Sequence, residues 1–338
     1  MPMKQVLIDM PVDARAMERL RAIGDIDVRI TEPVEDVRPL PAALLRDVQI
    51  LFCAYPPENF ADMQSLELIQ IYSVGCNQLY ALGLPQKGVR ACNAQGVFDV
   101  PIAEWNLAMM VNLARNLRGM IRNQEAGVWD RGAEFQREIR GLTVGIWGYG
   151  GIGRETARVA KALGMAVHVM SRQGVGPRAN TYCLEGTGDP AGTLPDRVFV
   201  GGQEREFLAD LDFLILSMPL AASTAGIIGE NELRALPRTA FVLNPARGPL
   251  IREEALLKAL REGWISGAAL DTHYGYPLPP EHPLWRFPNV IMTPHISGSS
   301  LSPHSNTRTW DIFVQNVERY MNGRALLNQL SPAQLNGA

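Results

Sequence analysis

An arginine and a histidine each follow an apolar run in the second half of the chain. Arg247 comes directly after AFVLNPA, and His295 comes directly after NVIMTP. If both runs are parallel strands, both side chains lie at the carboxyl edge of a sheet, where open α/β sheets bind their ligands. A guanidinium can hold a carboxylate through two hydrogen bonds, and an imidazole can give or take a proton near neutral pH. The pair predicts a site that binds a small anion and transfers a proton, unless Arg247 forms a structural ion pair instead.

A glycine-rich turn lies upstream of these two residues. Gly148, Gly150 and Gly153 form the pattern GxGxxG, and Gly151 and Ile152 complete the segment GYGGIG. The turn follows the apolar run LTVGIW and opens the helix-like stretch RETARVAKALG. The first glycine allows a tight turn, the second lets the backbone approach a pyrophosphate, and the third lets helix and strand pack closely. This context predicts a dinucleotide-binding turn.

The end of the next expected strand indicates which dinucleotide binds. An NAD-selective site has an Asp or Glu there, about 20 residues after the glycines, to hold the ribose hydroxyls. Here the strand ends in Ser171 and Arg172. Because a guanidinium pairs with the additional charge of a 2′-phosphate, we expect NADP to be favoured and NAD to be possible. The alternative is that Arg172 faces solvent and NAD is accepted.

The pattern of apolar runs predicts the elements that position these residues. The runs KQVLID, DVRI, VQILFC, LIQIYSVG and VRACNA are expected strands, and a second series of strands begins at Leu142. Their residues are apolar on both faces, as in parallel strands between two helix layers. We also expect a long helix over residues 100–118, an extended loop over 172–206, and a helix after His295 that returns to the first domain.

Composition limits the classes of function. The chain has 338 residues, enough for two domains, and its 32 Lys and Arg against 35 Asp and Glu disfavour nucleic acid as a partner. The four cysteines form no CxxC pair, so we expect reduced thiols and no metal site. Asp9 and Asp13 interrupt the N-terminal segment, and no run is long enough to span a membrane. We therefore expect a cytoplasmic protein.

Several segments together resemble the D-isomer-specific 2-hydroxyacid dehydrogenase family, which includes formate, glycerate and phosphite dehydrogenases. These segments are YSVGCNQL, GYGGIG, LNPARGPLIREEALLKAL, GAALDTHYGYP, HPLW and MTPHISG. The resemblance covers nearly the whole length and implies two Rossmann-like, doubly wound parallel-sheet domains. A discontinuous, flavodoxin-like substrate domain would comprise residues 1–100 and 296–338, and a dinucleotide-binding domain of residues 101–295 would be inserted in it. The resemblance also implies a homodimer.

The resemblance assigns a role to each matching residue. Arg247 would bind the carboxylate and carbonyl oxygen of the substrate, His295 would supply the proton, and the amides of Val74 and Gly75 would also hold the carboxylate. Asp271 would contact the nicotinamide end of the cofactor. The residues that would line the dinucleotide cleft are Met218, Pro219, Thr224, Pro245 and Ala246. The other histidines, which we interpret as packing or surface residues, are His168, His273, His282 and His304.

The chain departs from the family pattern next to the histidine. Most members have a glutamate five positions after the aspartate that matches Asp271, whereas this chain has Tyr276 there, before Pro277. A carboxylate favours the protonated imidazole, and a phenol offers only a hydrogen bond. We therefore expect His295 to be harder to protonate than in those members. Alternatively, Tyr276 packs against the substrate.

The resemblance implies an oxidoreductase that transfers a hydride between NAD(P)H and a small 2-oxo acid, giving a D-2-hydroxy acid. Formate dehydrogenases also lack the glutamate and have a pair like Ser297 and Gly298, so a formate-like hydride donor is an alternative substrate. The spacing of residues 91–104 differs from theirs, and Asn93 receives no role. A nucleotide-sensing regulator on the same scaffold is a second alternative, which the retention of both Arg247 and His295 disfavours.

Overall fold

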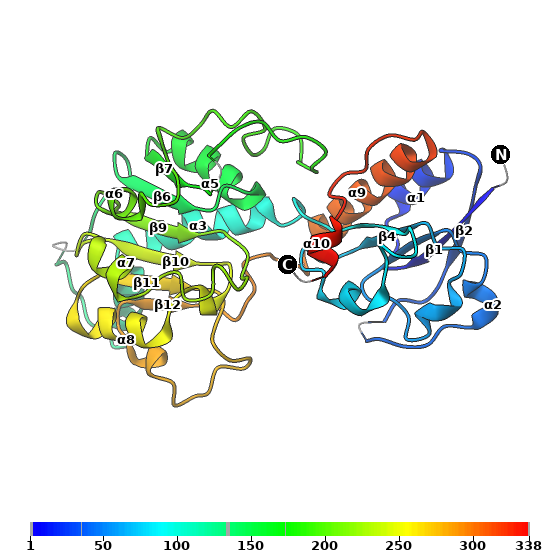
Figure 1. Cartoon of the computed structure of the whole chain (residues 1–338). Coiled ribbons are helices and arrows are strands. Elements are labelled where there is room, and N and C mark those ends of the chain that lie inside the picture. The colour runs from blue at the N-terminus through cyan, green and yellow to red at the C-terminus, as the bar shows by residue number, and fades with distance from the viewer. Residues whose placement is uncertain (1–2, 35, 133–135, 173, 337–338) are drawn as a thin grey trace. The chain divides into compact units, whose positions relative to one another are not determined.

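The computed structural model describes residues 3–34, 36–132, 136–172 and 174–336. The chain forms two compact units: unit 1 comprises residues 1–97, 179–184 and 300–338, and unit 2 comprises residues 98–178 and 185–299. Each unit contains one parallel sheet (Figure 1). The predicted α/β fold with two doubly wound parallel sheets is confirmed.

The first unit has five strands in the order β2-β1-β3-β4-β5, all parallel. This is the strand order of flavodoxin-like sheets. Its strands are β1 (Lys4–Asp9), β2 (Ile26–Ile30), β3 (Ile50–Cys53), β4 (Leu68–Ile71) and β5 (Arg90–Cys92), and its helices are α1 (Ala14–Arg21), α2 (Ala42–Leu45), α9 (Pro303–Met321) and α10 (Pro332–Leu335).

Alternation along the strands of unit 1 sends apolar side chains to both faces of the sheet. Val6 and Ile8 of β1 pack with Trp310 and Phe313 of α9, whereas Leu7 packs on the opposite face in a cluster that includes α2 and α10. The predicted helix after His295 therefore exists as α9, and it covers the first sheet, as expected. Because both faces are covered, the functional groups of this sheet are confined to its strand ends.

The second unit has seven parallel strands in the order β12-β11-β10-β9-β6-β7-β8. Strand β6 comes first in the chain and its two neighbours are β7 and β9, so the order reverses beside it, as in a Rossmann sheet. The strands are β6 (Thr143–Trp147), β7 (Ala166–Met170), β8 (Arg197–Phe199), β9 (Phe213–Leu216), β10 (Phe241–Asn244), β11 (Gly267–Leu270) and β12 (Val290–Met292). The helices are α3 (Asp99–Ala114), α4 (Leu117–Glu125), α5 (Gly151–Ala162), α6 (Glu204–Leu208), α7 (Glu230–Ala235) and α8 (Glu253–Glu262).

Two apolar layers also enclose the second sheet. Val144 and Ile146 of β6 pack with α3 and α5, whereas Trp147 packs on the opposite face with α6, α7 and α8. The aromatic ring of Phe207 in α6 contacts Trp147 edge-on, with 5.8 Å between ring centroids. The carboxyl edge of this sheet is left for the turns that carry the predicted site residues.

The observed elements differ from the predicted ones in two places. The helix predicted over 100–118 ends at Ala114, and α4 begins after Asn116, whose φ of +48° is incompatible with a continuous helix. The loop predicted over 172–206 contains strand β8 and the start of α6. Strand β8 has three residues, too few to show a period in the sequence.

Part of the same loop belongs to the other unit. Residues 179–184 cluster with unit 1, where the Tyr182 amide donates to the Asn328 side chain at 3.1 Å and the Asn328 amide donates to the Asn180 carbonyl at 2.9 Å. The chain therefore passes between the units at four points, after residues 97, 178, 184 and 299. The domain boundaries expected from the sequence, at residues 100 and 295, would give only two passages between the units.

Candidate active site

The turn between β6 and α5 needs each of its three pattern glycines for a separate reason. Gly148 has a φ of +100°, and a Cβ there would meet the backbone of Ser217 and Met218. A Cβ at Gly153 would clash with the carbonyl oxygen of Gly148. In contrast, nothing lies within 4 Å of the Cβ position of Gly150. The second glycine therefore leaves open space at the first turn of α5, which fits a dinucleotide pyrophosphate.

Two further residues of the turn, Gly151 and Ile152, pack against neighbouring parts of unit 2. The carboxylate of Asp99, from α3, fills the position that a Cβ of Gly151 would take. Ile152 is partly buried in the first turn of α5. Gly151 is thus a glycine because α3 and α5 pack closely there, independently of any cofactor.

The end of β7 presents Ser171 and Arg172. The Ser171 hydroxyl donates to the Gly174 carbonyl at 2.8 Å, which leaves its oxygen able to accept a further hydrogen bond. Arg172 is exposed, and it makes no hydrogen bond or ion pair with the described residues. Its guanidinium is available to an anion.

The five predicted cleft residues lie in the turns that follow β9 and β10. The Thr224 hydroxyl donates to the Pro219 carbonyl at 2.7 Å and accepts from the Ala221 amide at 2.8 Å, which closes the loop after β9. Met218 and Pro245 are buried, Ala246 is partly buried, and Pro219 is exposed. The loop after β9 is therefore ordered by its own hydrogen bonds.

The strand order places the predicted residues along one edge of the second sheet. Since all seven strands are parallel, the turns after them lie at the same edge. From β12 to β7 that edge carries His295, Asp271, Arg247, Pro219, Gly148 and Ser171. The glycine turn lies at the point where the strand order reverses, between the proton-transfer candidates and the candidate 2′-phosphate site.

His295 has an unusual backbone conformation beside Tyr276. Its φ is +58°, in the left-handed region that a residue with a side chain rarely adopts. Its amide donates to the carbonyl of Asp271 at 2.8 Å and to that of Thr293 at 3.0 Å. The ring centroids of Tyr276 and His295 are 5.6 Å apart, and the rings are tilted by 52°. Residues held in this region cluster at functional sites because the surrounding contacts must stabilise them.

The surroundings of His295 disfavour its protonated form. Desolvation by the protein packed around part of the ring lowers its pKa below the ordinary value of 6.5, and the positive charge of Arg247 lowers it further. Asp271 raises the pKa, and His273 lowers it. The expectation that His295 is hard to protonate agrees with these contributions, among which Arg247 is the charged group that lowers the pKa most.

Arg247 is exposed at the end of β10, in a turn that a buried asparagine shapes. The Asn244 side chain accepts from the amides of Ala246 and Arg247 at 3.1 and 3.2 Å and donates to the Arg247 carbonyl at 2.8 Å. The guanidinium itself donates to the Ala246 carbonyl at 2.7 Å. Within the described residues it has no acidic partner, so the alternative of a structural ion pair is not what the structure contains.

Asp271 is fully buried, and its carboxylate holds the segment that carries His295. It accepts from the Thr293 hydroxyl at 2.5 Å and from the amides of Ile296 and Ser297 at 2.9 and 3.0 Å. The Trp105 indole donates to the same Thr293 hydroxyl at 3.1 Å. In this structure Asp271 therefore positions the turn around His295, and its contact with a nicotinamide stays a prediction.

His273, which we interpreted from the sequence as a packing residue, is buried beside the candidate site. It is 7% exposed, its Nε2 lies 2.8 Å from the Thr293 carbonyl, and its Nδ1 has no partner among the described residues. Its amide donates to the Tyr276 hydroxyl at 3.3 Å, and its carbonyl would clash with a Cβ at Gly248, next to Arg247. Its position two residues after Asp271 was the one feature of the sequence that indicated a place near the candidate site.

Val74 and Gly75 lie in unit 1, in the turn that follows β4. The Asn93 side chain donates to the Val74 carbonyl at 2.7 Å, and the Ser73 hydroxyl donates to the Gly75 carbonyl at 2.6 Å. The amides of Val74 and Gly75 make no hydrogen bond to the described residues, and both residues are exposed. These amides are available to bind an anion, and Asn93, to which we gave no role, holds the Val74 carbonyl.

The other histidines and the cysteines lie away from this edge or take part in packing. His282 Nε2 lies 2.6 Å from a Glu253 carboxylate oxygen, and His168 is buried beside Phe199. Cys53, Cys76 and Cys92 are buried, Cys183 is exposed, and no two of them form a disulfide. No set of three His, Cys, Asp or Glu in the described part of the chain is arranged to hold a metal.

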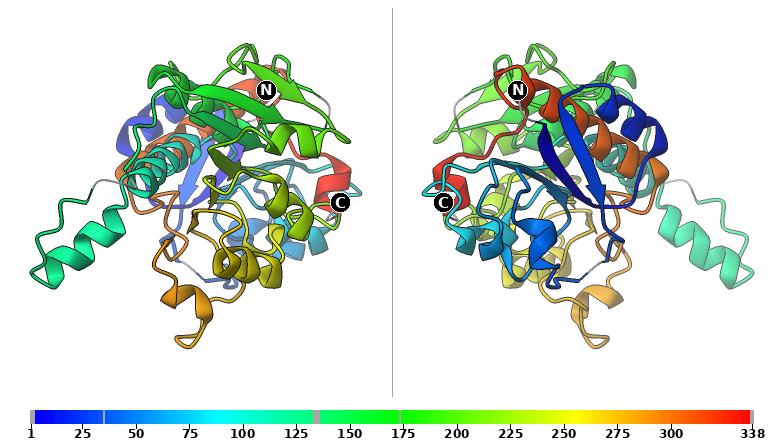
Figure 2. Two further views of the ribbon diagram at one scale, coloured as in Figure 1. Left: turned by 90° about the vertical axis from the view of Figure 1, so that its left-hand side faces the viewer. Right: turned by 90° about the vertical axis from the view of Figure 1, so that its right-hand side faces the viewer.

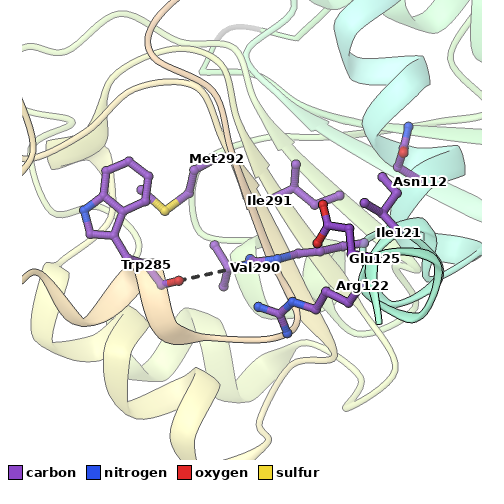
Figure 3. Close-up of a pocket in the computed structure, with 9 residues that line it drawn as sticks. Asn112, Ile121, Arg122, Glu125, Trp285, Val290, Ile291 and Met292 are labelled. Atoms are coloured by element: carbon purple, nitrogen blue, oxygen red, sulfur yellow. Dashed lines mark hydrogen bonds between the residues drawn. The ribbon is translucent and has the colours of Figure 1, made fainter. Parts of the chain in front are cut away.

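A cavity of about 360 Å³ lies elsewhere in unit 2 (Figure 3). Side chains of α3 and α4, including Ile121 and Arg122, face Val290, Ile291 and Met292 of β12 across it. The Arg118 guanidinium reaches the Trp285 carbonyl at 3.5 Å. None of the predicted site residues lines this cavity, so we do not assign it to the chemistry.

The strand order, the glycine turn and the Arg247–His295 edge together define an α/β protein with a dinucleotide-binding turn beside an arginine and a histidine. Comparison with known proteins agrees. Residues 107–297, more than half of the chain, match the model of the D-isomer specific 2-hydroxyacid dehydrogenase, NAD binding domain. The chain therefore belongs to the D-isomer specific 2-hydroxyacid dehydrogenase family.

Individual relatives cover most of the chain. It is 29% identical over 300 residues to a glyoxylate reductase of Thermofilum pendens, covering 86% of this chain and 82% of that one. It is 30% identical to a putative 2-hydroxyacid dehydrogenase of Haemophilus influenzae, covering 78% and 80%. The structure of a D-isomer specific 2-hydroxyacid dehydrogenase from Xanthobacter autotrophicus Py2, in complex with NADPH and MES, is 26% identical. It matches with a TM-score of 0.74 and covers 98% of this chain and 99% of that one.

No helix among the described residues is both long enough and apolar enough to cross a membrane.

Proposed function

We propose that the protein reduces a small 2-oxo acid to the D-2-hydroxy acid, with Arg247 and His295 as its catalytic residues. The observation that carries the proposal is the exposed Arg247 guanidinium, which has no acidic partner among the described residues and lies at the same sheet edge as His295, whose pKa its charge lowers. Relatives named glyoxylate reductase support a substrate with few carbon atoms.

The residues of this chain would divide the chemistry as follows. When bound, a reduced nicotinamide supplies a hydride to the carbonyl carbon of the substrate. Arg247 binds the substrate carboxylate and polarises the carbonyl oxygen, since its donors have no competing carboxylate. His295 gives its ring proton to that oxygen, so that the hydroxyl group forms as the hydride is added. Tyr276 borders the site beside His295, and the amides of Val74 and Gly75 are predicted, from the resemblance, to bind the carboxylate as well.

The experiment that tests this function is oxidation of NADPH and NADH with a panel of 2-oxo acids that includes glyoxylate, hydroxypyruvate and pyruvate. We expect one or more of these acids to be reduced, and His295→Gln and Arg247→Gln each to lower kcat/KM by about 10²-fold or more. His304→Gln, on an exposed histidine of α9, is the matched control. Reduction by His295→Gln at the unaltered rate would contradict the proposed role of the histidine.

For the cofactor, we propose that NADPH is preferred and that NADH is used less well. Arg172 at the end of β7 is exposed and has no partner in the described part of the chain, and the Ser171 oxygen next to it can accept a hydrogen bond. A 2′-phosphate would pair with that guanidinium. The complex of the Xanthobacter relative with NADPH supports the same preference.

A formate-like hydride donor is the second candidate substrate. The observation that favours it is the absence of a carboxylate at position 276, since Tyr276 is the side chain beside His295 and the pKa of His295 is lowered. Hydride release from formate leaves carbon dioxide and needs no proton on the substrate oxygen. Formation of NADH or NADPH from formate and the oxidised cofactor, with no reduction of any 2-oxo acid, would favour this candidate over the first.

We also propose that the protein is a homodimer located in the cytoplasm. Helix α4 has no buried residue, and with the segment after it, it extends away from the rest of unit 2 in both views of Figure 2. Leu117, Ile121, Val128 and Trp129 expose apolar side chains along it. An apolar surface of this kind, on an element with few contacts of its own, is typical of a protein interface.

A further inference from the structure

A buried carboxylate in the loop between β7 and β8 has no part in the chemistry proposed above. Asp189 is 5% exposed and accepts four hydrogen bonds. Three come from the amides of Gly192, Thr193 and Leu194, each at 3.0 Å, and the fourth comes from the Tyr149 hydroxyl at 2.7 Å. Burial alone would raise the pKa of Asp189, but these donors outweigh it and the pKa is lowered. The carboxylate is therefore charged and fully paired.

The fourth donor belongs to the dinucleotide-binding turn. Tyr149 stands between Gly148 and Gly150, and its side chain is 8% exposed. Its backbone carbonyl accepts from Arg154 Nε at 3.2 Å, and the Arg154 guanidinium lies 4.9 Å from its ring centroid. Both the side chain and the backbone of the one residue between the first two glycines are thus held in place.

Arg154 connects the same loop to the turn a second time. Its guanidinium also donates to the carbonyls of Asp189 and Gly176, the latter at 2.7 Å. One helical position further, the carboxylate of Glu155 accepts from the Gly188 amide at 2.6 Å. The loop is therefore fastened along the first turn of α5, the part of the helix whose amides would face a pyrophosphate.

We infer that Asp189 is a positioning residue for the cofactor, which acts through Tyr149 to hold the glycine turn in its binding conformation. A glycine-rich turn has many accessible conformations, and ordering it on binding costs free energy. A turn that is already held by a buried, charge-assisted hydrogen bond avoids part of that cost. This inference rests on the proposed function, because it requires that the turn bind a nicotinamide dinucleotide.

The test compares two variants that each remove one side of the Asp189–Tyr149 hydrogen bond. In Asp189→Asn the side chain is uncharged and keeps only one oxygen that can accept hydrogen bonds. In Tyr149→Phe the hydroxyl donor is lost, whereas the ring and its contact with Arg154 remain. We expect the Kd for NADPH, measured by nucleotide fluorescence, to rise about tenfold in each variant, as the loss of one charge-assisted hydrogen bond implies. At saturating NADPH, kcat should be unchanged, and the double variant should bind no worse than the weaker single variant.

Asp196→Asn is the matched control. Asp196 is also a carboxylate of the β7–β8 connection, and it accepts from the Val167 amide at 2.7 Å and from Lys161 at 2.7 Å, away from the glycine turn. We expect it to lower Tm without changing the Kd for NADPH. If Asp189→Asn and Tyr149→Phe likewise lower Tm and leave Kd unchanged, Asp189 only anchors the loop and the inference is wrong. Wild-type protein that binds neither NADPH nor NADH would contradict the proposed function itself, whatever the variants do.

Discussion

At the scale of single residues, the site is unusual in having no carboxylate at position 276. The ring of Tyr276 lies 5.6 Å from that of His295, and its hydroxyl is held by the His273 amide. Asp271, the remaining acid near the histidine, is committed to the 293–297 segment through three donors. The pKa of His295 is therefore lowered by desolvation and by its positive neighbour Arg247, and Asp271 offsets these effects only in part.

The pH dependence of reduction follows from this arrangement. The proposed reduction requires protonated His295, so we expect the rate to fall as pH rises through the pKa of His295, which is lowered below 6.5. Tyr276→Glu adds an opposite charge and should move the alkaline limb of kcat/KM for reduction upward by about 1 unit or more. Tyr276→Gln is the neutral control and should leave the limb in place. If Tyr276→Glu binds cofactor with an unshifted limb, the tyrosine serves to pack against substrate and this prediction is wrong.

A second residue-scale prediction concerns the cofactor. Removing the guanidinium in Arg172→Ala should weaken NADPH binding about tenfold and leave NADH binding nearly unchanged, because only NADPH has the 2′-phosphate. Arg178→Ala, in the same loop but beyond the end of β7, is the matched control. Fluorescence titration with each cofactor measures both constants. An equal loss for the two cofactors would show that Arg172 does not distinguish them.

At the scale of elements, the pattern glycines of the turn from β6 into α5 separate into two that close packing requires and one that leaves space for a ligand. Gly148 is closely packed against the backbone of Ser217 and Met218 and Gly153 against the Gly148 carbonyl, whereas Gly150 faces open space with an ordinary φ of −77°. The described residues of the β7–β8 connection form no helix before β8. Asp189 and Gly188 of this connection hydrogen-bond to Tyr149 of the turn and to Glu155 of α5. A loop without regular structure thus has a defined conformation because its partners are in α5.

Alanine substitutions in the turn test this separation. Gly150→Ala should fold with an unchanged Tm, since the Cβ meets nothing, and should lose cofactor affinity by about tenfold or more because the methyl group enters the pyrophosphate space. Gly153→Ala places a Cβ against the Gly148 carbonyl and should lower stability by roughly 1–3 kcal/mol. Thermal unfolding and NADPH titration of both variants make the comparison. A Gly150→Ala protein with wild-type affinity would place the pyrophosphate elsewhere.

At the scale of the whole molecule, the chain passes between its two units four times, and residues 179–184 belong to unit 1 although they lie within a loop of unit 2. The loop that holds the glycine turn is therefore continuous with a segment packed on Asn328 of unit 1. Helix α4, in contrast, has no buried residue. The first feature adds two covalent connections between the units, after residues 178 and 184, and the second leaves apolar side chains exposed on α4.

Assembly can be tested on the exposed side chains of the α4 segment. Trp129 is 90% exposed and Ile121 is 46% exposed, and an isologous dimer would bury both. We expect sedimentation to give a dimer for the wild type and a monomer for the double variant Ile121→Ser, Trp129→Ser. Ile30→Ser, on β2 of unit 1, is the control and should remain dimeric. Wild-type protein that sediments as a monomer at micromolar concentration would overturn the proposed assembly.

Most of the fold and much of the candidate site could be predicted from the sequence, because their signals are local. A strand buried on both faces needs a continuous apolar run, and a turn between strand and helix needs glycines at positions with particular backbone angles. The ends of the runs then indicate which residues follow each strand, so Arg247, His295 and the glycine turn were found without knowledge of their neighbours.

Long-range contacts decided the rest. His273 lies beside the candidate site because β11 lies between β10 and β12, which brings its backbone against Gly248 and its ring against the Thr293 carbonyl. Asp189 holds Tyr149 although 40 residues separate them in the chain, and 179–184 packs with unit 1 through Asn328. A segment without apolar periodicity has no conformational preference strong enough to be read locally. Its conformation is set by the buried partners that only the folded chain brings to it.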